Sequence, residues 1–368
     1  MYEGLVKPLL FRMDAERAHN LAIRACDAAG RSGTLRGAMA RRFGVDDPRL
    51  RTAVAGIEFA NPLGLAAGFD KNGRAVTMLG SMGFGHVELG SVSAYESHGN
   101  PRPRLWRLPD DHAVVVYYGV PNDGAEAVAA RLARRRPAVP LGINLVKTND
   151  PNRPAVEPDV YDDFARSMRL LAGAADYVTL NLSCPNSADD RDFFDDHDRI
   201  GTLLGHLADV TIEVPLVLKL KPTTDRGKLR DIVQIADVFP SVRGFAINLP
   251  SGRPKHLKLK SAAAVLDFRP GAIAGEPVES YLNEVLAHLY DAIGPGSRYA
   301  LIAAGGVASA EAAYRKIRLG ASLVQLYTGL IYHGPRLVPE ILRGLADRLE
   351  RDGFDSVEKA VGSGMGRD

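Results

Sequence analysis

From Asn61 onward the chain alternates short apolar runs with longer segments of helical periodicity, separated by polar or glycine-rich clusters. Short runs rich in Val, Ile and Leu are typical of strands buried on both faces, and helix-length spacers favour parallel pairing through crossover helices. Eight strands are the number that closes a (β/α)8 barrel, so the sequence predicts an α/β TIM barrel. The predicted strands are Leu63–Ala67, His86–Leu89, Leu141–Leu145, Tyr177–Leu182, Leu216–Leu220, Gly244–Asn248, Tyr299–Ala303 and Leu323–Tyr327.

An open, doubly wound sheet is the alternative way to arrange alternating strands and helices. A dinucleotide-binding sheet of that kind carries a glycine-rich fingerprint after its first strand and an acidic residue about 20 positions later. The segment from Asn61 to Lys71 does not supply glycines at that spacing. The barrel is therefore the favoured fold.

The first 42 residues have a different pattern. Eight basic side chains stand against four acidic ones, and apolar residues such as Leu5, Leu9 and Leu21 recur between them. This pattern is typical of short basic amphipathic helices, which either cap a soluble domain or lie on a membrane surface. We expect residues 1–42 to form a small N-terminal helical extension and residues 43–368 to form the barrel domain.

The composition is that of a globular protein. Of 368 residues, 46% are hydrophobic and 24% are charged, with 46 basic against 44 acidic side chains, which excludes a disordered chain and a strongly nucleic-acid-binding one. Two cysteines are too few for a disulfide framework and indicate a reducing compartment. Because no run of 18 apolar residues and no signal-peptide pattern occurs, we expect neither a membrane span nor export by that route.

Polar residues gather where the predicted strands end, and in a barrel the chemistry collects at the carboxyl ends of the strands. Asn144, Asn181 and Asn248 come from three separate strands and offer uncharged donors and acceptors, which suits a planar heteroaromatic ring. Lys71 and Lys219 add positive charge for an electron-rich ring or a carboxylate. A single asparagine at a strand end is more often a cap of the local backbone, but three on separate strands favour a binding site.

Glycines follow the last two predicted strands. Gly305 and Gly306 come after the seventh strand, and Thr328 and Gly329 after the eighth, where barrels commonly bind phosphate through backbone N–H groups. A glycine pair alone is often a simple turn. Together with the asparagines, these positions predict a phosphorylated cofactor with a large polar ring.

Cys184 is the chemically reactive candidate among the strand-end residues. It lies in a polar loop after the fourth predicted strand, where a thiol is a plausible proton acceptor or nucleophile, whereas Cys26 reads as a small buried hydrophobe in a helix. The sequence shows no catalytic serine triad and no histidine or carboxylate cluster at the strand ends, so we expect no metal site. The acid-rich segment Asp189–Asp196 is interpreted as a solvated lid in which Phe193 and Phe194 close.

Several separate segments, in the same order, resemble the dihydroorotate dehydrogenases, specifically the membrane-associated class 2 that uses quinones. The resemblance covers nearly the whole chain. It implies an FMN-containing barrel that oxidises dihydroorotate to orotate in pyrimidine synthesis and passes the electrons to a membrane quinone. It also implies a quinone tunnel under the N-terminal helices and a peripheral location on the cytoplasmic face of the membrane. The matching segments are Phe11–Ala22, Asn61–Asn72, Gly99–Pro109, Asn181–Asn186, Gly320–Tyr327 and Asp352–Gly362.

The resemblance assigns roles position by position. Cys184 stands at the position of the catalytic base. The positions that match substrate contacts are Lys71, Asn181, Asn186 and Asn248, and those that match the quinone tunnel are His19, Arg107 and Tyr327. The positions that match FMN contacts are Ala66, Ala67, Gly68, Gly90, Ser91, Asn144, Asn181, Lys219, Asn248, Gly275, Gly305, Gly306, Tyr327 and Thr328.

The chain departs from the class 2 pattern around the substrate. Cys184 replaces a serine and is the residue type of the soluble class 1 enzymes, and either group can take the C5 proton as hydride leaves C6. Polar or aromatic positions of the family are held here by Val116, Val120, Pro121, Leu249 and Pro250. Because of these changes, a second possible function is that of an FMN oxidoreductase with a less polar substrate. A third, less favoured one is that of a non-catalytic barrel that binds flavin or a partner. As an assembly we expect a monomer or a homodimer.

Overall fold

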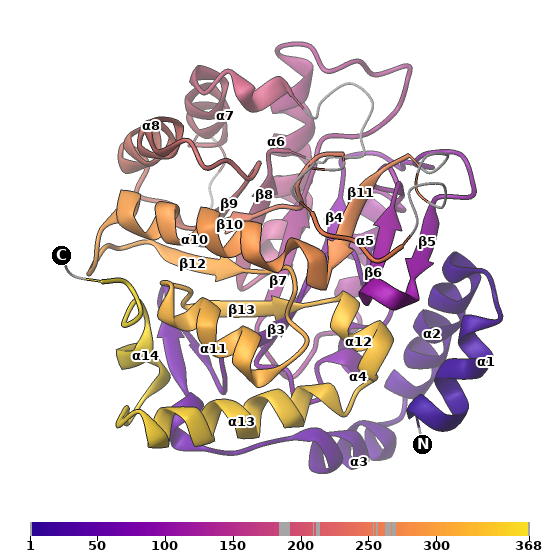
Figure 1. Cartoon of the computed structure of the whole chain (residues 1–368). Helices are drawn as coiled ribbons and strands as arrows, with labels where there is room; N and C mark the ends of the chain where they lie inside the picture. The colour runs from indigo at the N-terminus through magenta and orange to yellow at the C-terminus, as the bar shows by residue number, and fades with distance from the viewer. Residues whose placement is uncertain are drawn as a thin grey trace.

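The computed structural model describes residues 2–183, 192–208, 210, 214–252, 254, 257–261, 266 and 270–366. Its centre is a closed barrel of eight parallel strands (Figure 1). In order around the barrel these are β3 (Leu63–Leu65), β4 (His86–Val92), β7 (Leu141–Leu145), β8 (Tyr177–Asn181), β9 (Leu216–Leu220), β10 (Val242–Ile247), β12 (Ala300–Ala303) and β13 (Leu323–Leu326). Each predicted run overlaps one of these strands, although β4 extends past the predicted end and β10 begins before the predicted start, so the predicted (β/α)8 barrel is confirmed.

Helices lie outside the barrel in the connections between the strands (Figure 1). In α6, Val160, Phe164, Met168 and Leu171 recur at helical spacing and are all buried, so this face of the helix packs onto the sheet. The helices of the barrel are α4 (Val76–Leu79), α5 (Ala125–Leu132), α6 (Asp159–Leu171), α7 (Asp198–Ala208), α8 (Arg226–Asp237), α10 (Glu279–Ile293), α11 (Ala310–Arg318), α12 (Thr328–His333), α13 (Leu337–Arg351) and α14 (Val357–Ala360).

One end of the barrel is covered by a hairpin that precedes it. Strands β1 (Thr52–Val54) and β2 (Ile57–Phe59) pair antiparallel, and Phe59 packs into a small apolar cluster with Tyr177 and Leu323, the first residues of β8 and β13. The hairpin therefore closes the amino end of the barrel, and the opposite end is left for the site.

A second, antiparallel sheet arises from insertions in two strand-to-strand connections. Its order is β11 (Ala272–Gly275), β6 (Ala113–Val116) and β5 (Leu105–Leu108). The sequence pattern did not predict these strands, because each has only four residues and β11 comes from a distant part of the chain. The short helices are η2 (Pro48–Leu50), η3 (Pro109–Asp111), η4 (Ala172–Ala174), η5 (Phe193–Asp195) and η6 (Glu276–Val278).

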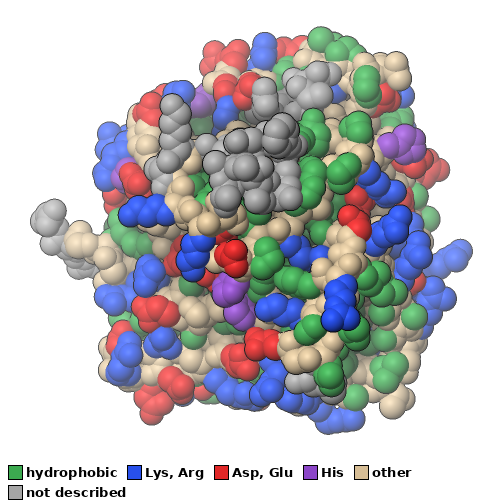
Figure 2. Space-filling view, turned by 45° about the vertical axis from the view of Figure 1, so that its right-hand side comes forward, with side chains coloured by type: hydrophobic (Ala, Val, Ile, Leu, Met, Phe, Trp, Pro, Cys, Tyr) green, Lys and Arg blue, Asp and Glu red, His purple; other side chains and the backbone are tan. Residues whose placement is uncertain are grey.

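The N-terminal segment forms η1 (Tyr2–Val6), α1 (Lys7–Phe11), α2 (Ala15–Gly30) and α3 (Gly33–Phe43), beside β5 and α4 (Figure 1). Asp14 and Ser32 cap α2 and α3 by accepting backbone N–H bonds from Arg17 and Leu35. Figure 2 turns this part of the molecule toward the viewer and shows hydrophobic and basic side chains side by side on it. None of the helices in the described ranges is long and apolar enough to cross a membrane.

Candidate active site

A large cavity opens at the carboxyl ends of the barrel strands, which we call the barrel-end cavity. Its empty volume is about 1240 Å³, including space at its open mouth. The second sheet forms part of its wall through Val114, Val116 and Ala274. Twelve of the fourteen positions that match FMN contacts line it: Ala66, Ala67, Gly68, Ser91, Asn181, Lys219, Asn248, Gly275, Gly305, Gly306, Tyr327 and Thr328.

The two glycines after β12 can only be glycines in this fold. Gly305 and Gly306 have φ angles of +87° and +75°, a region that other residues rarely adopt. A Cβ on Gly305 would lie 2.3 Å from Leu282 Cδ1, and one on Gly306 would lie 2.4 Å from Glu279 Cβ. The backbone here lines the cavity without side chains, next to Thr328, the first residue of α12. Such a cradle of backbone N–H groups suits a phosphate.

A directed chain of hydrogen bonds crosses the floor of the cavity. Asn248 Nδ2 donates to Asn181 Oδ1 at 2.9 Å, and Asn181 Nδ2 donates to Ser91 Oγ at 3.2 Å. Ser91 Oγ donates to Asn144 Oδ1 at 2.5 Å, and Asn144 Nδ2 donates to Glu88 Oε1 at 2.9 Å. Asn144 thus lies behind the lining and orients Ser91, and the chain of donors ends on a carboxylate.

Glu88 lies beneath the cavity floor and was not singled out by the sequence analysis. Its carboxylate lies in the barrel interior, 1% exposed, and its Oε2 accepts from Tyr177 OH at 3.1 Å and Gln325 Nε2 at 2.9 Å. The sequence analysis assigned His86–Leu89 as an apolar strand. Nothing in the sequence indicated that the acidic side chain within this strand points into the barrel. Because the Glu88 carboxylate can only accept, Asn144 must donate to it, and this sets which atom donates in each further hydrogen bond of the chain.

Lys71 brings positive charge into the same cavity. Its Nζ donates to the Gly68 carbonyl at 2.7 Å and lies 4.0 Å from the centre of the Tyr118 ring. Burial lowers the pKa of Lys71 to about 8. The preceding residue, Asp70, anchors the loop by accepting backbone N–H bonds from Asn72, Arg74 and Ala75. The loop after β3 therefore holds an ammonium group at a fixed place in the wall.

Tyr118 is a second residue that the strand-end analysis did not single out. It lines the cavity under Lys71, and its hydroxyl is buried without a hydrogen-bond partner among the described residues. Val116, Val120 and Leu249, the departures from the class 2 pattern, line the same cavity. One part of the wall is therefore apolar where the family pattern is polar or aromatic.

Two predicted site residues, Cys184 and Asn186, lie outside the described residues. Asn181 and Ser183, which precede them in the sequence, lie within the described residues. Asn248 Nδ2 also donates to the Ser183 carbonyl at 2.5 Å. On the far side of this loop, Phe193 and Phe194 are buried and stack edge to face. These two rings pack against Tyr161 and Phe164 of α6.

A second cavity lies between the N-terminal helices and the barrel, and we call it the N-terminal cavity. Its empty volume is about 890 Å³, and its wall is largely apolar, with Leu10, Phe11, Ala18, Phe69 and Ile331 among its members. Of the predicted tunnel residues, His19 and Arg107 line it, whereas Tyr327 lines the barrel-end cavity. Val114 borders both cavities, so at this point a single side chain separates them.

Two polar residues that line the N-terminal cavity, His19 and Arg107, are held in different ways. Burial and the charge of Lys71 lower the pKa of His19 to about 3, so its imidazole is neutral near pH 7. Arg107 donates to the Met13 carbonyl at 2.9 Å and lies over the Phe11 ring at 4.6 Å. The cavity therefore offers one neutral ring and one cation in an apolar wall.

Comparison with known proteins places this architecture in one family. Residues 49–349 match the sequence profile described as dihydroorotate dehydrogenase. A protein of Natronomonas pharaonis named dihydroorotate dehydrogenase (quinone) is 40% identical over 97% of this chain and 98% of its own. One of the same name from Mycobacterium tuberculosis is 39% identical over 99% of this chain and 98% of its own.

Solved structures give the same result. The ligand-free DHODH of Eimeria tenella superposes with a TM-score of 0.82 at 28% identity, covering 96% of this chain and 100% of that one. Its complex with ferulenol superposes with a TM-score of 0.79 at 27% identity and 95% coverage of both chains. The resemblance seen in the sequence is confirmed over its full extent, and the chain belongs to the dihydroorotate dehydrogenase family.

Proposed function

We propose that this chain oxidises dihydroorotate to orotate with FMN as its resident cofactor and passes the electrons to a membrane quinone. The observation that carries the proposal is the pair of adjacent cavities. One is floored by oriented amides and also holds Lys71 and Lys219, the other is apolar and lies under the N-terminal helices, and Val114 borders both. A polar substrate and an apolar electron acceptor would then bind at separate places, close to one cofactor.

The residues of the barrel-end cavity fit a flavin mononucleotide. Gly305, Gly306 and Thr328 would hold its phosphate through the side-chain-free backbone described above. Asn181, Asn248 and Lys219 would hold its ring, because they present amide groups and a cation in the same cavity. Bound FMN supplies the two-electron redox chemistry of the reaction.

The substrate would lie against the wall that carries Lys71. Dihydroorotate has one carboxylate and a cyclic ureide with alternating C=O and N–H groups. The ammonium of Lys71 would pair with the carboxylate, and the Asn181 and Asn248 side chains would bond the ureide. Cys184 would take the proton from C5 as hydride leaves C6. Asn186, two residues further on, would bind the substrate from the same loop.

The N-terminal cavity would take the quinone. Its wall is largely apolar, with His19, Arg107, Tyr2 and Cys26 as the exceptions, and its lining residues from α1 and α2 suit an isoprenoid tail. Leu5 and Leu9 are 65% and 64% exposed on the same segment, next to basic side chains. Such a surface suits a peripheral position on the cytoplasmic face of the membrane, with residues 1–42 as the membrane-facing part.

The first test is anaerobic reduction of the flavin by dihydroorotate in the purified full-length protein. We expect the yellow colour to bleach and to return when a ubiquinone or menaquinone analogue is added. Cys184→Ala should keep the flavin but slow bleaching by at least about 100-fold, within the range for a lost general base. Cys26→Ala is the matched control and should bleach at the wild-type rate. A flavin that dithionite reduces but dihydroorotate does not would overturn the substrate.

A less polar substrate is the second candidate, because Val116 and Leu249 line the cavity where the family pattern is polar. Val116→Asn separates the two possibilities. If dihydroorotate is the substrate, the added amide should tighten orotate binding, since a good hydrogen bond is worth roughly 1 kcal/mol. Unchanged or weaker orotate binding, measured by calorimetry, would favour the less polar substrate.

A further inference from the structure

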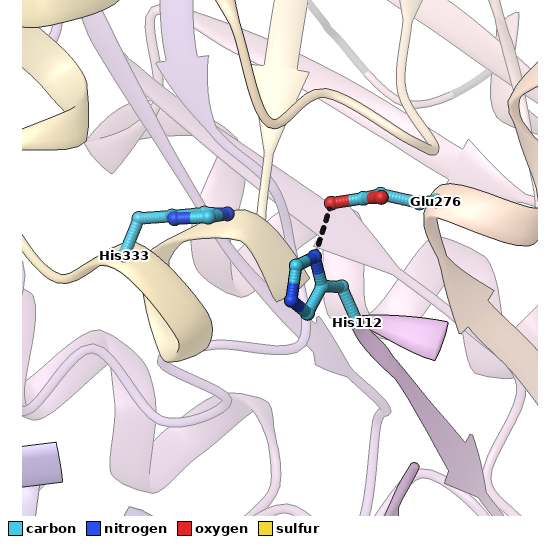
Figure 3. A group of neighbouring side chains, drawn as sticks. All are labelled: His112, Glu276 and His333. Carbon is cyan, nitrogen blue, oxygen red and sulfur yellow. Dashed lines mark hydrogen bonds and ion pairs between the residues drawn. The ribbon is translucent and has the colours of Figure 1, made fainter. Parts of the chain in front are cut away.

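Three side chains from distant parts of the sequence meet at the rim of the barrel-end cavity. His112 follows η3 in the turn between β5 and β6, Glu276 begins η6 directly after β11, and His333 ends α12. Figure 3 shows the two imidazoles and the carboxylate turned toward one another. One ligand atom from each lies within 4.8 Å of the other two.

The pair at the centre of the group is in hydrogen-bond contact and would have to separate by about 0.5 Å to bind one ion. His112 Nδ1 lies 2.8 Å from Glu276 Oε1, and the rings of His112 and His333 have centres 5.5 Å apart at an angle of 83°. Around a tetrahedral ion with bonds of about 2.0–2.1 Å, ligand atoms are roughly 3.3 Å apart. His333 would thus have to move by an ångström or so, which a side chain at the end of a helix can do by rotating.

Neighbouring residues hold His112 and Glu276 in position. The His112 ring lies 5.2 Å from the ring of Tyr332, whose hydroxyl donates to the Ala113 carbonyl at 2.7 Å. Glu276 follows Gly275, whose backbone pairs with Ala113 in the β6–β11 ladder. His112 and Glu276 are each 44% exposed, so their ligand atoms can be reached from solvent.

A second carboxylate lies beside His333. Glu3 of η1 has Oε1 3.7 Å from Nδ1 of His333, and its side chain is 68% exposed. Two imidazoles with one or two carboxylates form a ligand set that suits borderline ions such as Zn²⁺ rather than Mg²⁺ or Ca²⁺, which prefer oxygen ligands alone.

We propose that His112, Glu276 and His333 form a binding site for one divalent transition-metal ion of the Zn²⁺ type. An ion there would join the second sheet and α12. It would also fix the part of the cavity wall that His112 and Glu276 supply. The inference depends only on these side chains and not on the proposed substrate or acceptor.

The test is equilibrium dialysis of untagged, full-length protein against micromolar Zn²⁺, followed by metal analysis and by calorimetric titration. We expect about one ion per chain, not displaced by a thousandfold excess of Mg²⁺. His112→Ala, His333→Ala and Glu276→Gln should each weaken binding by at least about 10-fold, the size of effect seen for losses around metal sites. Thermal unfolding of each variant without metal would show that it is folded, and Glu276→Gln preserves the size of the side chain.

The matched control is His206→Ala. His206 pairs with Asp162 at 3.0 Å, another histidine and carboxylate at the surface, but no third ligand joins them among the described residues. This variant should bind Zn²⁺ as the wild type does. Absence of binding at millimolar Zn²⁺ would overturn the site, as would equal loss in His206→Ala, displacement by Mg²⁺, or wild-type affinity in His112→Ala and His333→Ala.

Discussion

The ring of Phe69 meets the ring of Tyr327 edge to face, with centres 5.4 Å apart, and on its other side it meets His19 in the same way at 5.3 Å. Tyr327 lines the barrel-end cavity, whereas Phe69 and His19 line the N-terminal cavity. These three rings form a continuous stack through the wall between the cavities. In the proposed reaction they would connect the wall of the flavin site with the wall of the quinone site.

Replacing Phe69 by leucine should therefore affect the quinone half of the reaction more than the dihydroorotate half. Two edge-to-face contacts would be lost, each worth about 0.5–1.5 kcal/mol, so we expect the KM for a quinone analogue to rise at least about 5-fold and at most about 150-fold. Anaerobic flavin reduction by dihydroorotate should stay within about twofold of the wild-type rate. Stopped-flow measurement of the two half-reactions separates these effects.

Phe84→Leu is the control for this prediction. Phe84 is buried like Phe69 but lines neither cavity. It should lose stability without a change in the KM for the quinone. An equal rise of that KM in both variants would mean that the effect is a general loosening of the fold.

Glu88→Gln should loosen the amide chain on the cavity floor. Glu88 accepts hydrogen bonds from Asn144, Tyr177 and Gln325, and a glutamine would turn its own NH₂ group toward at least one of these donors. An unsatisfied buried group costs about 1–3 kcal/mol, so thermal unfolding should shift downward by a corresponding amount. Ser91 and Asn181 would lose their fixed orientation, and the purified variant should hold less FMN.

The control is Glu58→Gln, since Glu58 is exposed on β2 at the closed end of the barrel. It should unfold at the wild-type temperature with full FMN content. If Glu88→Gln behaved in the same way, the carboxylate would have no part in orienting the floor.

The barrel could be predicted from the sequence because its eight strands are buried on both faces and each gives a continuous apolar run. Once the strands are assigned, the residues at their carboxyl ends are known as well. The apolar pattern alone was therefore enough to assign positions such as Asn181, Lys219 and Gly306 to one end of the barrel. The same reasoning failed to identify Glu88. In the sequence, an acidic residue that points into the barrel looks like a single polar residue within an apolar run.

The second sheet and the metal candidate could not be predicted in this way. Strands β6 and β11 are four residues each and pair across more than 150 positions of sequence, which leaves no local signal. His112, Glu276 and His333 each look like an isolated polar residue, and only that pairing, together with α12, brings them to one point. The expectation of no metal therefore rested on the strand ends alone.

The charge of Lys71 predicts how orotate binding depends on pH. Burial lowers its pKa to about 8, from 10.5 in an unfolded chain. Only the ammonium form attracts a carboxylate, so the Kd for orotate should be constant below about pH 8 and rise by up to tenfold per pH unit above it. Flavin absorbance changes on titration with orotate between pH 6.5 and 9.5 would measure this, and Lys71→Met should bind weakly with no such break.

The lowered pKa of Lys71 also affects the stability of the fold. Orotate binding should weaken as the pH rises, whereas the stability should increase. Below pH 8 the folded protein carries the cost of a buried ammonium, and between pH 8 and 10.5 the unfolded chain binds the proton that the folded one has released. Stability contributed by this position therefore rises with pH in that window. Lys71→Met should be more stable than the wild type at pH 7, and the difference should shrink above pH 8.

The link between the N-terminal helices and the barrel-end cavity can be tested at Glu16. Its carboxylate on α2 accepts from Arg104 at 2.8 Å, with side-chain exposures of 9% and 7%. Arg104 in turn lies 5.4 Å from the Tyr118 ring, which carries Lys71 on it. Glu16→Gln leaves the guanidinium with its carbonyl partners at His98 and Asn100. We therefore expect a loss of about 2–3 kcal/mol, less than for a fully orphaned buried charge.

The pH dependence of this loss identifies its cause. Burial raises the pKa of Glu16, but bonds and charges from Arg104 and Arg102 outweigh it and bring the pKa below 4.5. The ion pair therefore stabilises the fold above about pH 4.5, and its contribution disappears as the pH falls through the lowered pKa. Denaturant unfolding of the wild type and of Glu16→Gln should differ at pH 7 and converge toward pH 3. Glu311→Gln, which breaks a surface pair with Arg348, should cost less than about 1 kcal/mol at either pH. A difference that persists at pH 3 would show that Glu16 acts through packing rather than through its charge.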